Sequence, residues 1–173
     1  QTLVLSGQHD GGVNLARFSP NGQWIVSASR GQAQLWNAKT GKPATDAIRL
    51  AAPQEITDLA FSADSQRLAI ATDLGNLRVW DTSTREFIGP PLSRFRARRP
   101  GAQRAGLRMA RFSPDGQRIV TASADGSACI WDLRSQALLL ALVHSNRVDC
   151  ARYSPDGRRL LTASWDGTAK IWN

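Results

Sequence analysis

The stretch SADGSACIWDL at residues 123–133 returns in nearly the same form as SWDGTAKIWN at residues 164–173. Each copy holds a serine, an Asp-Gly pair and a short apolar run that reaches a tryptophan. Asp-Gly favours a tight β-hairpin because both turn residues tolerate a positive φ. The run TAKIW, which follows the second Asp-Gly, has the length of a strand. The two copies therefore predict a repeated unit built from hairpins.

Working outward from these copies, we find the unit four times. Its opening segments are LARFSPNGQWIVSAS, DLAFSADSQRLAIAT, MARFSPDGQRIVTAS and CARYSPDGRRLLTAS. The closing tryptophans follow at intervals of 44, 51 and 41 residues, at Trp36, Trp80, Trp131 and Trp172. The Ser-Pro-Asp-Gly segments supply turn residues between two strand-like runs. Each unit therefore reads as strand, turn, strand, turn and strand, followed by an outer strand.

This pattern resembles the WD-repeat family, in which a unit of about 40 to 45 residues forms one four-stranded propeller blade. The resemblance implies an all-β propeller with four four-stranded blades in a single domain, residues 1–173. The predicted blade repeats are residues 9–50, 51–92, 103–143 and 144–173. We expect outer strands at 86–92 and 137–143, and residues 1–7 read as an outer strand that completes a last blade. Residues 93–108 would form a basic loop between the second and third blades.

Rings of this family usually contain seven or eight blades, so four blades are expected to leave the ring open. We expect a second copy of the chain to close one eight-bladed ring, each copy donating its first strand to the other's last blade in a twofold arrangement. The alternative is that these residues are part of a longer propeller chain.

The resemblance also implies a hydrogen-bonded tetrad in the fourth repeat. Its members would be His144, Thr162, Asp166 and Trp172, with Ser164 as an alternative hydroxyl. The donors and acceptors of such a chain balance. Arg30 and Leu74 occupy the aspartate position in the first two repeats, so we expect blades of uneven stability, with the second the most degenerate.

A histidine, a hydroxyl and an aspartate also occur together in catalytic triads. Here the hydroxyl would lie inside a strand and bond to a tryptophan, and no Gly-x-Ser-x-Gly motif is present. The two histidines and two cysteines do not have metal-ligand spacing. We therefore expect a non-catalytic protein with no cofactor and no metal.

The family's propellers usually act as rigid platforms for protein or peptide partners, which often bind the upper face. Positions matching the family's contact residues are Trp165, Arg147, Asp149, Arg108, Asn14, Thr57 and Asp73. Trp165 is the strongest candidate because an exposed aromatic supplies much contact area. The alternative is that Trp165 packs against the neighbouring blade.

The net charge of +8 has a local source, since residues 94–108 hold six arginines and no acidic residue. Guanidinium groups bind carboxylates and phosphates through paired donors. An acidic protein partner, or phosphate or nucleic acid, are therefore alternative ligands for Arg94, Arg96, Arg98, Arg99, Arg104 and Arg108. The third alternative is a solvated insertion without a ligand.

No segment approaches the roughly 18 consecutive apolar residues of a membrane helix, and the amino end lacks the basic start of a signal peptide. We expect a cytoplasmic protein with no membrane partner.

Overall fold

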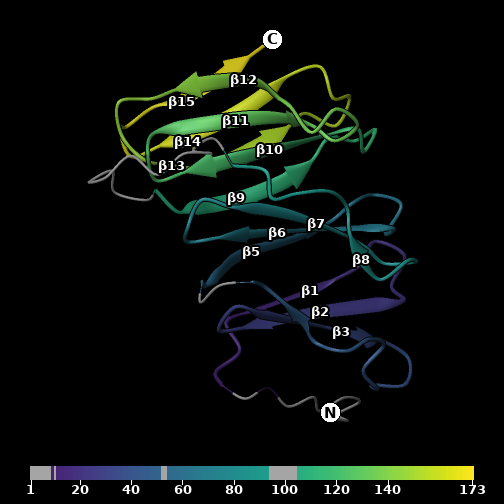
Figure 1. Cartoon of the computed structure of the whole chain (residues 1–173). Coiled ribbons are helices and arrows are strands. Elements are labelled where there is room, and N and C mark those ends of the chain that lie inside the picture. Colours follow the sequence, from purple (N-terminus) through teal and green to yellow (C-terminus); the bar gives the residue numbers. More distant parts are fainter. Residues whose placement is uncertain (1–8, 10, 52–53, 94–104) are drawn as a thin grey trace, which may run out of the picture.

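The computed structural model describes residue 9 and residues 11–51, 54–93 and 105–173. These residues form fifteen β-strands and no helix, arranged in four antiparallel sheets that follow one another along the chain. Figure 1 shows the sheets stacked in a row, from the first (purple) to the fourth (yellow). The expected all-β architecture is confirmed, and each sheet is called a blade below.

The strands have the following bounds. Blade 1 contains β1 (Leu15–Phe18), β2 (Trp24–Ser29), β3 (Gln32–Asn37) and β4 (Ile48–Arg49). Blade 2 contains β5 (Ile56–Phe61), β6 (Arg67–Thr72), β7 (Leu77–Asp81) and β8 (Glu86–Phe87). Blade 3 contains β9 (Leu107–Phe112), β10 (Arg118–Ser123), β11 (Ser127–Asp132) and β12 (Leu138–Val143). Blade 4 contains β13 (Val148–Tyr153), β14 (Leu160–Ser164) and β15 (Ala169–Trp172).

Within each blade, consecutive strands pair side by side, as a chain of tight hairpins requires. The first hairpin of each blade uses the same device. In blade 3 the Ser113 hydroxyl donates to Asp115, and the Gly116 N–H donates to the Ser113 carbonyl over 2.9 Å. Gly116 has a φ of 68°, which glycine adopts without steric cost. Ser65 takes this place in blade 2 with a φ of 62°.

The outer strand of blade 2 is shorter than the sequence predicted. We expected a strand over residues 86–92, but β8 ends at Phe87, and pairing resumes only at a single bridge between Leu77 and Leu92. Gly89 has a positive φ, and Pro90 and Pro91 have no N–H to donate to a ladder. The chain therefore leaves the sheet between these points. The strand expected at residues 137–143 is present as β12.

The hydrophobic cores lie between neighbouring blades. Leu35 of blade 1 packs in one buried cluster with Leu59 and Ile70 of blade 2. Val79 of blade 2 shares a second cluster with Ile119 of blade 3, and blades 3 and 4 share a third. Both faces of an interior blade are therefore buried, which explains why β6 reads as a nearly continuous apolar run.

A buried carboxylate joins three blades. Asp58 on β5 has a side chain that is 5% exposed. It accepts a hydrogen bond from the Ala110 N–H over 3.1 Å and pairs with Arg111, both on blade 3. On its other side, Arg17 of blade 1 lies 3.7 Å away. A buried charge is stable only when paired and hydrogen-bonded, and these contacts supply both conditions.

The two end blades each expose a face that is covered elsewhere in the row. Val13 precedes β1 and is 51% exposed, whereas Val148, at the same repeat position in blade 4, is fully buried. Ile171 on β15 is 68% exposed, but the matching Leu35 of blade 1 is 1% exposed. Phe18 and Leu161 are exposed in the same way. The row therefore ends in two apolar faces, each of the kind that binds a neighbouring blade inside the row.

Residues 1–7, expected to complete a last blade, lie outside the described residues. In the described chain, blade 4 has three strands.

Candidate interaction surface

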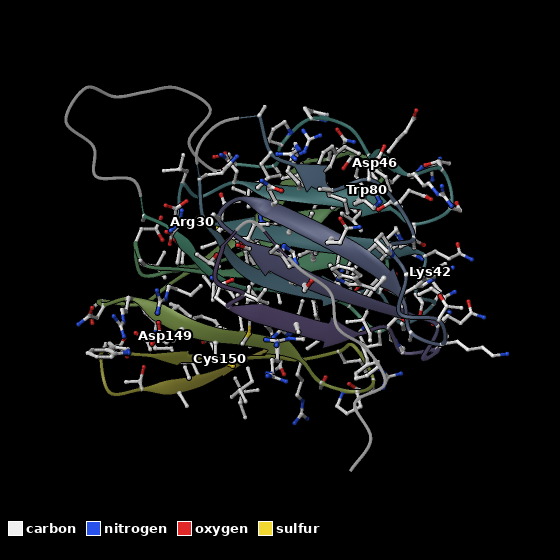
Figure 2. The ribbon with its side chains drawn as sticks, turned by 90° about the horizontal axis from the view of Figure 1, so that it is seen from below. Arg30, Lys42, Asp46, Trp80, Asp149 and Cys150 are labelled. Carbon is white, nitrogen blue, oxygen red and sulfur yellow. The ribbon has the colours of Figure 1, made fainter. Side chains whose placement is uncertain are left out.

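We use upper face for the side of the stacked blades on which the β2–β3, β6–β7, β10–β11 and β14–β15 turns lie. The lower face is the opposite side, on which the β1–β2 and β3–β4 turns and their equivalents lie. Figure 2 shows Arg30 and Asp149 toward one end of the strands, and Lys42 and Asp46 toward the other.

Three of the predicted contact residues occupy equivalent β-bulges at the upper face. The register of the first strand slips once in each of blades 2, 3 and 4, which leaves Thr57, Arg108 and Asp149 as the extra residues. A bulge turns a side chain away from the regular alternation of a strand. These residues are thus aimed by a feature of the backbone that recurs from blade to blade.

The structure brings four candidates together across blades 3 and 4. The Trp165 ring follows β14 and is held from two sides, because its Nε1 donates to Asp149 Oδ2 over 2.5 Å and Arg147 lies 3.5 Å from its centroid. Asp149 also pairs with Arg147 and with Arg108, each at 3.3 Å. Trp165 nevertheless remains 62% exposed. We call Arg108, Arg147, Asp149 and Trp165 the tryptophan cluster.

In the described chain, the Trp165 side chain is held within blade 4. The indole contacts side chains of its own blade and keeps most of its surface open to solvent. Its orientation is fixed before any partner arrives, which reduces the entropy lost on binding. The cation–π contact with Arg147 stabilises this orientation by roughly 0.5–1 kcal/mol, the usual value at an exposed site.

The other candidates lie apart from the cluster. Asn14 is exposed beside blade 1, and its N–H donates to Ala28. Asp73 holds the segment that precedes β5, since its Oδ1 accepts a hydrogen bond from the Glu55 N–H over 2.8 Å. Thr57 is half-buried on blade 2. Arg94, Arg96, Arg98, Arg99 and Arg104 lie outside the described residues, so phosphate or nucleic-acid binding through that loop stays a prediction.

A second group of candidates lies inside blade 4. Trp172 Nε1 donates to Thr162 Oγ1 over 2.9 Å, and Thr162 contacts His144 Nε2 at 2.8 Å. His144 Nδ1 lies 2.9 Å from Asp166 Oδ2. This order requires a neutral imidazole with its proton on Nδ1, so that Nε2 accepts from the threonine hydroxyl. The structure therefore joins these four residues in a single chain of hydrogen bonds.

Asp166 is the acidic end of this chain. A hydrogen bond from the Thr168 hydroxyl, with others from His144 and from the N–H groups of Thr168 and Ser145, lowers the pKa of Asp166 far below its usual value. Partial burial acts in the opposite direction. The carboxylate is ionised at neutral pH and orients the imidazole.

The other blades carry shorter versions. Trp36 and Trp131 donate to Ser27 and Thr121, over 2.7 and 3.0 Å, and His9 reaches Ser27 at 2.6 Å. Blade 2 has Ile70 at the hydroxyl position. The indole N–H of its Trp80 is buried and has no hydrogen-bond partner among the described residues.

Sequence reasoning missed the Asp58 contact between blades. Its signal was an acid at a strand position where the other repeats carry Leu15, Met109 and Cys150. Among the residues that the structure describes, no group of three or more histidine, cysteine or acidic side chains could hold a metal ion. Nor does a search of these residues find a helix long and apolar enough to cross a membrane.

Comparison with known proteins gives the same family as the geometry. The model of the WD domain, G-beta repeat family matches residues 1–37, 48–81, 102–132 and 138–173. The Protein LST8 homolog of Drosophila melanogaster is 34% identical over 127 residues, which cover 69% of this chain and 37% of that protein.

Two more distant relatives show the same pattern. The Periodic tryptophan protein 2 homolog of Neurospora crassa is 29% identical, over 78% of this chain and 16% of that protein. Actin-interacting protein 1-2 of Arabidopsis thaliana is 27% identical, over 79% of this chain and 29% of that protein. The chain thus spans little more than a third of these relatives at most. By its four matched repeats and its four stacked sheets, the chain belongs to the WD-repeat family.

Proposed function

We propose that this protein is a non-catalytic scaffold whose upper face binds a peptide or protein segment through the tryptophan cluster. WD-repeat proteins generally act as protein-interaction scaffolds. The observation that carries the proposal is an indole that is 62% exposed, yet held by Asp149 and Arg147. Exposed aromatic and arginine side chains of this kind dominate the binding energy of many interfaces.

The chemistry of the partner follows from the charges around Trp165. Arg108 and Arg147 share a single carboxylate, Asp149, which leaves an excess of positive charge at the cluster. An acidic segment would meet complementary charge there, with an apolar side chain against the indole. Electrostatic complementarity of this type gives specificity and faster association.

The hydrogen-bonded chain in blade 4 supports a structural role over catalysis. Thr162 is fully buried and its hydroxyl already binds Trp172 and His144. A nucleophile must reach a substrate, and this oxygen has no open approach.

A peptide library displayed on phage and selected on the wild-type protein tests the upper face. The selected peptides are expected to bind Trp165→Ala at least about 30-fold more weakly, the effect of losing a binding hot spot of about 2 kcal/mol. Leu139→Ala is the control, because Leu139 is 50% exposed on β12 and lies outside the cluster. Peptides that bind both variants equally, or a library that yields no binder, would reject the proposal.

The end faces support a second part of the proposal, in which a second copy of the chain covers both of them. Exposed Val13 at one end, and Leu161 and Ile171 at the other, match buried positions inside the row. Exposed Phe18 matches half-buried positions. A head-to-tail contact on each side would bury both faces and close the ring.

The mass in solution tests this arrangement. A closed pair has twice the 18.8 kDa mass of the chain. Ile171→Asp is expected to shift the protein to the single-chain mass, whereas Leu139→Asp, outside the end faces, should leave the pair intact. A wild-type protein that stays at 18.8 kDa would reject the second copy and favour further blades of one longer polypeptide.

A further inference from the structure

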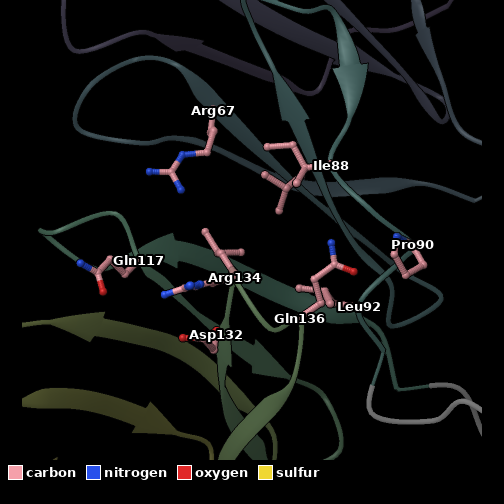
Figure 3. Close-up of a pocket in the computed structure, with 10 residues that line it drawn as sticks. Arg67, Ile88, Pro90, Leu92, Gln117, Asp132, Arg134 and Gln136 are labelled. Carbon is pink, nitrogen blue, oxygen red and sulfur yellow. The ribbon is translucent and has the colours of Figure 1, made fainter.

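A pocket of about 530 Å³ opens between blades 2 and 3, away from the tryptophan cluster. Figure 3 shows the side chains that line it. Its apolar wall comes from Val79, Ile88 and Leu92 of blade 2 and from Leu133 in the turn after β11. Arg67 and Arg134 line the same space and bring two guanidinium groups to it.

The departure of blade 2 from regular pairing creates this pocket. After the Ile88 N–H donates to Val79, the chain turns out of the sheet at Gly89 and Pro90. The amide of Gln136, from blade 3, lies against Gly89 so closely that a Cβ there would be 1.7 Å from Gln136 Nε2. A Cβ at residue 89 would require the flexible Gln136 side chain to shift, and the φ of 65° at Gly89 also favours glycine.

The charges in the pocket are unequal. Asp132 is the acidic residue of the lining, and its Oδ1 accepts from both the N–H and the hydroxyl of Ser135. Arg67 forms an ion pair with Asp64 at 3.7 Å and lies over the Phe112 ring, 5.6 Å from its centroid. In the described part of the chain, no carboxylate forms an ion pair with Arg134, which is exposed. At least one guanidinium therefore faces the pocket with free donors.

The space continues past Gln136. A neighbouring cavity of about 380 Å³ is bordered by Leu92 and Gln136, which also line the first pocket, and by Trp131 and Leu138. Two adjoining cavities suit an extended segment better than a single ion. The volume of the first also falls in the range of about 300–1,000 Å³ that is usual for ligand sites.

We propose that this pocket is a second binding site, which takes a short acidic segment of a partner protein. An aliphatic side chain of the segment packs against Val79, Leu92 and Leu133. The flanking carboxylates bind Arg67 and Arg134, because a guanidinium presents paired donors in the geometry of a carboxylate. The site is separate from the tryptophan cluster and does not depend on it.

Fluorescence anisotropy with labelled tetrapeptides tests the site. The probe is acetylated Asp-Leu-Val-Asp amide, and its neutral twin is acetylated Asn-Leu-Val-Asn amide. The acidic probe is expected to bind more tightly than the twin. Arg134→Gln should weaken its binding about fivefold to tenfold, the loss of one charge-assisted contact at a partly solvated site. Arg67→Gln should weaken it as well.

Two matched variants complete the test. Arg158→Gln makes the same charge change at an exposed position on blade 4 and should alter binding less than twofold. Arg134→Gln should weaken binding of the probe by the same factor in a Trp165→Ala background, which separates this site from the upper face.

Equal binding of the acidic and neutral peptides would overturn the proposal, as would equal effects of Arg134→Gln and Arg158→Gln. So would the absence of any binding up to about 1 mM. Competition with inorganic phosphate resolves the remaining case. If phosphate displaces the acidic probe while the Leu-Val pair can be replaced by Gly-Gly without loss, the pocket is a simple anion site and the peptide proposal is wrong.

Discussion

Replacing Thr162 by valine removes the central link of the blade 4 tetrad while preserving the shape of the side chain. The substitution leaves two groups without partners, Trp172 Nε1 and His144 Nε2. A buried polar group that loses its hydrogen bond costs about 1 to 3 kcal/mol. His144 is buried and takes a value in the middle of this range, whereas Trp172 is half-buried and takes the low end. The added methyl group returns about 0.8 kcal/mol.

The expected net effect of Thr162→Val is a loss of about 2 kcal/mol in the free energy of unfolding. Thr121→Val in blade 3 is the matched control, since it leaves the Trp131 indole without an acceptor and should cost about 1 kcal/mol. Urea unfolding followed by tryptophan fluorescence measures both. Hydrogen exchange should show faster exchange in β14 and β15 for the first variant. A loss below about 0.5 kcal/mol, or one no larger than that of Thr121→Val, would refute this account of the tetrad.

Three further predictions follow from single side chains. Burial raises the pKa of Tyr153 to about 12, and its buried hydroxyl has no hydrogen-bond partner in the described structure. Tyr153→Phe should therefore stabilise the fold by about 1 kcal/mol. A lower stability of this variant in urea would contradict the prediction. Asp58→Ala should lower the free energy of unfolding by about 3 kcal/mol, because Arg111 and the Ala110 N–H lose their shared acceptor. The exposed control, Asp46→Ala, should lower it by less than about 0.5 kcal/mol in the same assay. The folded-state pKa of Asp166 lies below its unfolded value of about 3.9, so its contribution to stability is complete above that pH and is lost as the pH falls further. Asp166→Asn should therefore flatten the acid side of a plot of urea midpoint against pH, and an unchanged profile would show that this carboxylate is not involved.

The sequence predicted the fold well because its signals recur. Four copies of the Ser-x-x-Gly type of turn, each between strand-like runs, report the same unit several times, so an irregular copy such as the one at Ser65 does not hide the pattern. The resemblance to the WD-repeat family also implied the roles of Thr162 and Trp172 in the tetrad. Local sequence and period were sufficient for the hairpins within each blade, although they predicted an outer strand of blade 2 that is longer than β8.

Features between blades could not be predicted in this way. Asp58 acts through Arg111, which lies 53 residues further along the chain, and no local pattern links the two. The pocket between blades 2 and 3 depends on where the chain leaves the sheet after Phe87. The sequence had predicted that the strand continues to residue 92.

The placement of the cores between sheets has a consequence for how such a chain can be shortened or lengthened. Since each core lies between two neighbouring blades, no blade encloses an interior of its own. A deletion that ends at a repeat boundary removes a neighbouring blade without disrupting any hairpin. An inserted repeat supplies a neighbouring blade again. Changes in length by whole units thus preserve the type of contact that holds the protein together, while a cut through the middle of a unit destroys it.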